Sequence, residues 1–77
     1  MKLDMEILKE IIRKVCANNG KEPPATITPQ THLRKDLNFD SYDLAELTVL
    51  LEDAFGVDIF EDGIVNNVGD ICKKLDA

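Results

Sequence analysis

The segment from residue 40 to residue 55 has the clearest pattern of hydrophobic and polar positions in the chain. At about 100° per residue, its larger apolar residues fall within about 140° of one another, as on the buried side of an amphipathic helix. Gly56 follows directly and is a natural helix stop. The pattern therefore predicts a helix over 40–55 with a core-facing stripe of Leu44, Leu47, Leu50, Leu51, Ala54 and Phe55.

The opposite side of this predicted helix mixes acidic and apolar residues. Its members are Glu46, Glu52 and Asp53, with Tyr42, Ala45 and Val49 among them. Acidic residues on a helix usually serve only to keep a surface soluble. Here they surround apolar side chains on one face, which favours a surface that docks to partners.

Two further helices are predicted, over residues 4–19 and from about residue 67 onward. The first has a buried stripe of Leu8, Ile11, Ile12, Val15 and Cys16 and is followed by Gly20; the last has one of Val68, Ile71, Cys72 and Leu75. Asn67 is suited to cap the last helix, with Asp70 three positions later.

The connections complete the prediction of an all-α fold. Residues 21–39 form a long, proline-punctuated loop, which we expect to be pinned by Ile27, Leu33, Leu37 and Phe39, with a helical turn at 31–36. Residues 56–60 read as a short extended linker with Val57 and Ile59 inward. Residues 61–65 can form about one helical turn, which Gly63 weakens. Three main helices and a minor one predict one small domain over 1–77.

Charge is distributed unevenly along the chain. The formal net charge is −6; residues 1–35 carry +3 and residues 36–77 carry −9. An acidic half repels nucleic acid and anionic lipid and suits protein partners with basic patches. No signal peptide or membrane-length apolar run is visible, so we expect a cytoplasmic monomer without stable membrane insertion. Cys16 and Cys72 are expected to be reduced thiols, although a disulfide between the first and last helices stays open.

The start of the central helix carries the candidate chemistry. Asp40 can accept hydrogen bonds from the first backbone N–H groups as an N-cap, with Asp43 near the positive end of the helix dipole. The Ser41 hydroxyl is then not needed for capping. We expect it to be exposed, beside backbone N–H groups that favour an anion such as a phosphodiester.

These residues resemble the acyl carrier protein family, whose Asp-Ser-Leu motif carries 4′-phosphopantetheine on the serine. The resemblance covers nearly the whole chain; it rests on Asp40-Ser41 and on matching motifs at 27–29, 36–37, 46–47, 51–52, 55–59 and 68–71. It implies a four-helix bundle with a long first loop and a short third helix. It also implies an arm on Ser41 donated from coenzyme A by a phosphopantetheinyl transferase, which itself needs Mg²⁺.

The resemblance further implies two surfaces. Acyl-transferring and condensing enzymes would dock at Tyr42, Asp43, Ala45, Glu46, Val49, Glu52 and Asp53. The acyl chain would lie among Leu47, Leu51, Phe55, Ile59, Ile64, Val68 and Ile71. The chain departs from the family pattern in two places. Tyr42 stands where Leu is usual, and the segment from Ile59 to Val68 is about two residues shorter than is common. Fatty-acid, polyketide and related pathways all stay open.

Other functions fit the residues less well. Hydrolysis would need a base for Ser41, and His32 is the single histidine, so we expect no enzymatic activity. The acids do not follow the ligand order of a calcium loop, so no metal site is expected. Phosphorylation of Ser41 and an unmodified interaction module that docks through the acidic helix are the alternatives to the carrier function.

Overall fold

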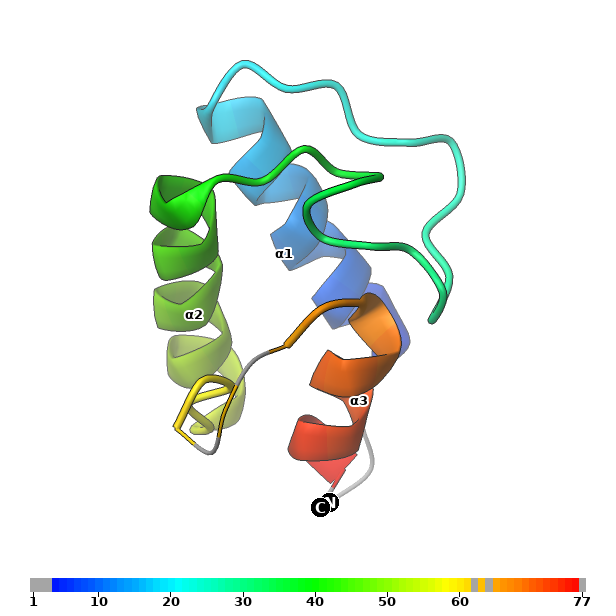
Figure 1. Cartoon of the computed structure of the whole chain (residues 1–77). Coiled ribbons are helices and arrows are strands. Elements are labelled where there is room, and N and C mark those ends of the chain that lie inside the picture. The colour runs from blue at the N-terminus through cyan, green and yellow to red at the C-terminus, as the bar shows by residue number, and fades with distance from the viewer. Residues whose placement is uncertain (1–3, 62, 64, 77) are drawn as a thin grey trace.

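In the part of the chain that the structure describes, the fold consists of three helices linked by one long and one shorter connection. The structure is a computed structural model that describes residues 4–61, 63 and 65–76. Within them, α1 spans Met5–Asn18, α2 spans Ser41–Phe55 and α3 spans Val68–Asp76. Figure 1 shows α1 crossing behind the space between α2 and α3, with the long connection arching over one end. All three helices were predicted from sequence to within a residue or two.

Local sequence explains where these helices begin and end. The Asp4 carboxylate accepts hydrogen bonds from the backbone N–H groups of Glu6 and Ile7 and so caps α1. Asn67 and Asp70 cap α3, since each side chain accepts from the other's backbone N–H, as predicted. Gly56 ends α2 in the left-handed conformation, with φ of 73°, which glycine adopts without steric cost.

The long connection between α1 and α2 is tied to the start of α3. The backbone N–H groups of Val68 and Gly69 donate to the carbonyls of Thr31 and Pro29, at 3.0 and 2.8 Å. These bonds satisfy N–H groups at the start of α3 that have no partner within the helix. The four apolar residues expected to pin the loop, Ile27, Leu33, Leu37 and Phe39, are all buried.

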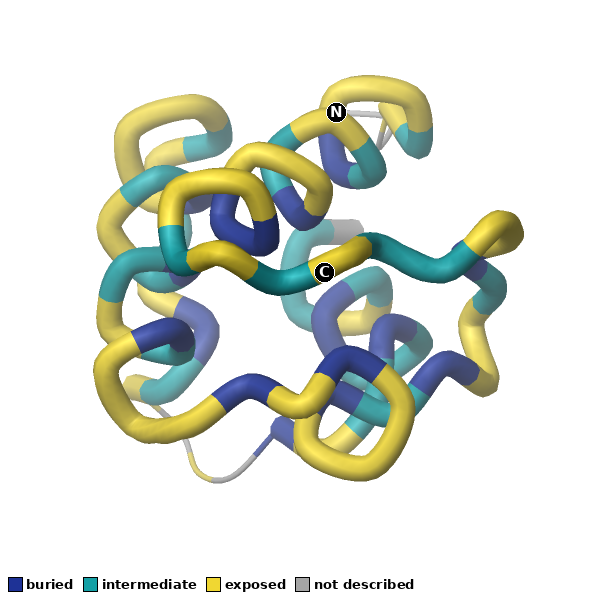
Figure 2. The backbone as a smooth tube through the Cα atoms, turned by 90° about the horizontal axis from the view of Figure 1, so that it is seen from above, coloured by how far each residue is buried: buried dark blue, intermediate teal, exposed yellow. Residues whose placement is uncertain are grey.

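The core lies between the three helices and beneath this loop. In Figure 2 the buried segments of the tube face the middle of the molecule. Its members come from every helix and both connections: Leu8, Ile12, Val15, Cys16, Ile27, Leu33, Leu37, Phe39, Leu47, Leu51, Ile59, Val65, Val68 and Ile71. Some residues expected to point inward are less buried than predicted. Ala54 is exposed, and the half-buried ones are Ile11, Leu44, Leu50, Phe55, Val57, Cys72 and Leu75.

The expected minor helix is absent from the part of the segment that the structure describes. Residues 59–61 form a turn, and Gly63 has φ of 138°, outside the helical region. Residues 62 and 64 lie outside the described residues, and with them the predicted pocket residue Ile64. The all-helical prediction is confirmed; the four-helix arrangement is not. Of the described helices, none has the length and apolar character needed to cross a membrane.

Candidate functional site

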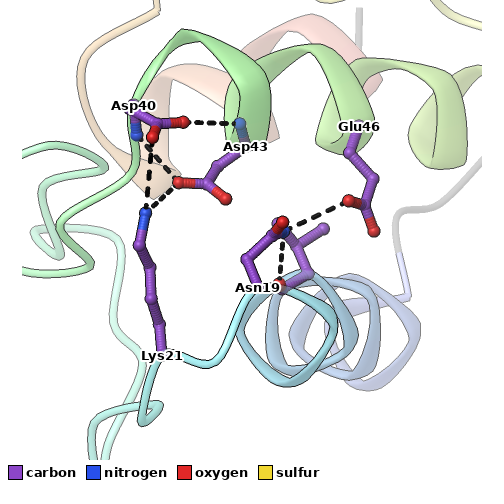
Figure 3. Close-up of polar contacts among 6 residues, drawn as sticks. Asn19, Lys21, Asp40, Asp43 and Glu46 are labelled. Carbon is purple, nitrogen blue, oxygen red and sulfur yellow. Dashed lines mark hydrogen bonds and ion pairs between the residues drawn. The ribbon is translucent and has the colours of Figure 1, made fainter.

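The beginning of α2 is held by a reciprocal pair of hydrogen bonds. The Asp43 backbone N–H donates to Asp40 Oδ1 at 3.0 Å, and the Asp40 backbone N–H donates to Asp43 Oδ2 at 2.9 Å (Figure 3). The bond from the Asp43 backbone is the main cause that lowers the pKa of Asp40, and the Lys21 ammonium lowers it further. Because the two carboxylates make the cap, Ser41 is left exposed at the first helical position.

Asp43 corrects one prediction. It was expected on the docking surface, but only 1% of it is exposed. Lys21 follows α1 in the chain. Its ammonium group pairs with Asp43 Oδ2 and lies 4.0 Å from Asp40 Oδ2 (Figure 3). The same ammonium lies 6.0 Å from the centre of the Phe39 ring. Asp43 is therefore an internal anchor that joins the start of α2 to the end of α1, and it is not available to a partner.

Glu46 makes a second link between α1 and α2. Its carboxylate accepts hydrogen bonds from the side-chain amides of Asn18, at 2.7 Å, and Asn19, at 3.1 Å. The Asn19 amide also donates to the Val15 carbonyl at 2.9 Å (Figure 3). The bond from Asn18, followed by that from Asn19, lowers the pKa of Glu46. Glu46 therefore contributes to holding the helices together as well as to the negative charge of the surface.

The rest of the predicted docking residues lie on the outer side of α2. Tyr42 and Val49 are 70% and 65% exposed, which is high for large apolar side chains. Ala45, Glu52 and Asp53 are also exposed. We call these five residues the outer face of α2. An open hollow of about 430 Å³ lies on this side, lined by Val49, Leu50, Glu52 and Asp53.

The expected acyl pocket is filled by its own side chains in this structure. Leu47, Leu51, Ile59, Val68 and Ile71 are completely buried members of the core. Phe55 is half-buried and packs against its edge. An acyl chain could enter among the five only if they moved apart, because a close-packed interior has no space to spare.

Two other hollows are open instead, and one of them is at Ser41. One, of about 260 Å³, is lined by Ser41, Leu44, Ala45, Thr48 and Phe60. The other, of about 270 Å³, is more enclosed and is lined by His32, Arg34, Leu44, Phe60, Val65 and Asn66. Leu44 and Phe60 line both, so the hollows adjoin.

Leu44, Thr48 and Phe60 line these hollows, and the sequence did not lead us to assign them to a site. A signal was present for the first two, since residues 41, 44, 45 and 48 follow the spacing of one helix face. Phe60 belongs to the connection after α2, whose path the sequence pattern does not fix.

The described residues give Ser41 no hydrolytic partner. His32 Nδ1 accepts the backbone N–H groups of Arg34 and Lys35, both at 3.1 Å, so its lone pair is occupied within the first loop. Burial raises the pKa of the Cys16 thiol and the nearby Asp43 carboxylate raises it further, so this thiol is a weak nucleophile. Cys16 and Cys72 are not joined by a disulfide. In the described part of the chain, no three potential metal ligands gather.

Comparison with known proteins agrees with this geometry. A family described as "Phosphopantetheine attachment site" matches residues 6–75. The acyl carrier protein of Helicobacter pylori strain G27 is 38% identical over 71 residues, which cover 90% of this chain and 91% of the relative. The acyl carrier protein of strain HPAG1 matches with the same figures. The chain therefore belongs to the acyl carrier protein family.

Proposed function

We propose that this chain is an acyl carrier whose Ser41 is joined to 4′-phosphopantetheine by a phosphodiester. The observation that carries the proposal is the exposed Ser41 at the first position of α2, where Asp40 and Asp43 already supply the capping bonds. Ser41 is also the single serine of the chain. A phosphopantetheinyl transferase would supply the arm from coenzyme A, using its own Mg²⁺.

The residues around Ser41 fit this group. The first backbone N–H groups of α2 and the positive end of its dipole favour a phosphodiester anion. The adjoining hollow of about 260 Å³ is lined mainly by the carbon atoms of Leu44, Ala45 and Phe60, which suit the aliphatic parts of an arm or a short acyl chain. When bound, the arm supplies a thiol that carries acyl groups as thioesters; this chain supplies attachment and presentation and does not act as an enzyme.

Recognition by partner enzymes is assigned to the outer face of α2. Tyr42 and Val49 offer exposed apolar area, and Glu52 and Asp53 offer negative charge beside them. Partners with Lys and Arg around a small apolar contact would complement this surface. The face begins one residue after Ser41, so docking would bring the arm to a partner's active site.

An unmodified interaction module is the second candidate, and the same outer face favours it. Such a protein would use Tyr42 and the acidic residues of α2 without a prosthetic group. Fatty-acid, polyketide and other acyl pathways all use the chemistry proposed here, and the unusual Tyr42 beside Ser41 favours a specialised pathway.

Intact-mass spectrometry separates these candidates. The purified chain is incubated with coenzyme A, Mg²⁺ and a phosphopantetheinyl transferase, and we expect its mass to rise by one phosphopantetheinyl group. Ser41→Ala should show no rise, while Thr48→Ala, which removes another hydroxyl beside the same hollow, should load normally. A wild-type chain that stays unmodified with several transferases would favour the interaction module.

A further inference from the structure

The more enclosed hollow is lined by residues of two chemical kinds. Leu44, Phe60 and Val65 are apolar, and His32, Arg34 and Asn66 are polar. Its volume of about 270 Å³ lies just below the range of about 300–1,000 Å³ that is usual for ligand pockets. It can therefore hold only a small group.

Arg34 is an exposed residue in the lining of this hollow, and its side chain carries hydrogen-bond donors. A guanidinium has five N–H donors and no acceptor, and it remains charged at any physiological pH. No Asp or Glu is among the residues that line the hollow, although the chain carries fifteen acidic residues. With Arg34 and no carboxylate in its lining, the hollow can attract an oxygen atom with partial or full negative charge.

His32 adds a second donor by virtue of its hydrogen bonds. Its Nδ1 accepts the backbone N–H groups of Arg34 and Lys35, so the proton of the neutral ring lies on Nε2. The His32 backbone N–H donates in turn to Asp36 Oδ2 at 2.6 Å, which fixes the residue at the start of its turn. The ring therefore has one N–H left to donate.

We propose that this hollow selects a short acyl group with an oxygen acceptor beyond its thioester over a saturated group of the same length. The proposal rests on the carrier function of Ser41 proposed above. The carbon atoms of the acyl group lie against Leu44, Phe60 and Val65, and a hydroxyl, keto or carboxylate oxygen accepts hydrogen bonds from Arg34 and His32. A saturated group would displace water from these donors without replacing its hydrogen bonds, and binding would be weaker.

Three acyl groups of equal carbon number test this selectivity. A phosphopantetheinyl transferase loads the chain from butanoyl-, 3-hydroxybutanoyl- or succinyl-coenzyme A, and the melting temperature of each product is measured. We expect the hydroxylated and carboxylated forms to melt at least about 4 °C above the butanoyl form, as one added hydrogen bond would produce in a domain of this size. If only the succinyl form melts at a higher temperature than the butanoyl form, the result would support the proposal and identify the acceptor as a carboxylate.

Arg34→Met should remove most of the difference in melting temperature between the oxygenated forms and the butanoyl form. The matched control Lys35→Met should keep this difference. Both residues are exposed neighbours with one positive charge, but only Arg34 lines the hollow. Equal melting temperatures for the three forms, or a difference that survives Arg34→Met, would overturn the proposal. Intact mass is measured first, because a chain that accepts no acyl-phosphopantetheine at Ser41 would overturn the carrier function itself.

Discussion

At the scale of single residues, the feature that shapes the site most is the ion pair between Lys21 and Asp43. Asp43 is buried, whereas the Lys21 side chain keeps 22% of its surface exposed. A buried carboxylate is costly unless charge and hydrogen bonds compensate it. Here Lys21 supplies the charge and the Asp40 backbone N–H supplies a hydrogen bond. The pair therefore holds the start of α2, and with it Ser41, against the segment that follows α1.

We predict that Lys21→Met lowers the free energy of unfolding by about 2–3 kcal/mol. Breaking a buried pair costs about 3–5 kcal/mol, and partial exposure of Lys21 to water reduces that figure. Urea unfolding measures the change, with Lys35→Met as an exposed control. Adding Asp43→Asn to Lys21→Met should restore part of the loss, because the amide oxygen still accepts at the cap without a charge. A Lys21→Met loss below about 0.5 kcal/mol would contradict an anchoring role.

Glu46 gives a pH-dependent prediction at the same scale. Hydrogen bonds from Asn18 and Asn19 lower its pKa in the folded chain, so the unfolded chain binds the proton more readily. The resulting stabilisation is complete above the unfolded pKa of about 4.3 and is lost as the pH falls through the lower, folded value. We expect wild type to exceed Glu46→Gln in stability at pH 6 and the difference to shrink towards pH 3.

Glu52→Gln is the control for this titration, since it removes the same charge from an exposed position of the same helix. Subtracting its effect leaves the contribution of the Asn18 and Asn19 bonds. Midpoints of urea unfolding, measured at four pH values between 3 and 6, would give the pH dependence of stability for both variants. A Glu46→Gln difference that stays constant over this range, after subtraction, would show that these bonds do not depend on the charge of Glu46.

At the scale of elements, α2 has two sides of different character. Leu47 and Leu51 fasten it to the core, while the outer face keeps Tyr42 and Val49 in water. Such exposure of large side chains is not needed for folding, so it is available for recognition. Because Glu46 also links α1 to α2, Glu52 and Asp53 are the better probes of docking.

We predict that Glu52→Lys slows loading by a phosphopantetheinyl transferase at low salt. Charges at the rim of an interface chiefly raise the association rate, and salt screens them. kcat/KM for loading should be several-fold lower for the variant than for wild type. As the salt concentration rises, the kcat/KM of wild type should approach that of the variant. Glu10→Lys makes the same charge change at an exposed position on α1 and should have a smaller effect. Equal losses in both variants would assign the effect to net charge.

At the scale of the whole molecule, one small core supports every surface described above. Its central members on α2 are completely buried, but Phe55 at the end of that helix is only half-buried. A domain of this size has a total stability near the lower end of about 5–15 kcal/mol. Removing a single central side chain therefore threatens the whole fold.

We predict that Leu51→Ala destabilises the chain more than Phe55→Ala. A fully buried leucine costs about 2–5 kcal/mol when truncated to alanine, whereas a half-buried ring loses less than the about 3–5 kcal/mol of a buried one. Parallel urea titrations of the two variants would rank them. The reverse order would mean that Phe55 contributes more to the core than its exposure indicates.

The sequence predicted those features that depend on neighbours along the chain. Periodicity located α1, α2 and α3, and the caps at Asp40 and Asn67 were predicted because their partners lie three residues away. The pairing of Asp43 was missed because its partner Lys21 lies twenty-two residues away. The open hollows were missed because they depend on the path of Phe60 after α2.

The exposure of Ser41 was predicted correctly, since it follows from local capping chemistry. Its modification is a chemical claim that exposure alone does not establish. The chain has four threonines, one tyrosine and two cysteines that could in principle carry a group instead.

Fragmentation mass spectrometry of the loaded chain tests the central claim most directly. The chain is loaded with coenzyme A and a phosphopantetheinyl transferase and digested, and the modified peptide is fragmented to locate the added group. We predict one modified residue, Ser41, joined through a phosphodiester that releases phosphopantetheine on fragmentation. An added group on Tyr42, Thr48 or either cysteine, with Ser41 unmodified, would contradict the assignment of Ser41 as the attachment site.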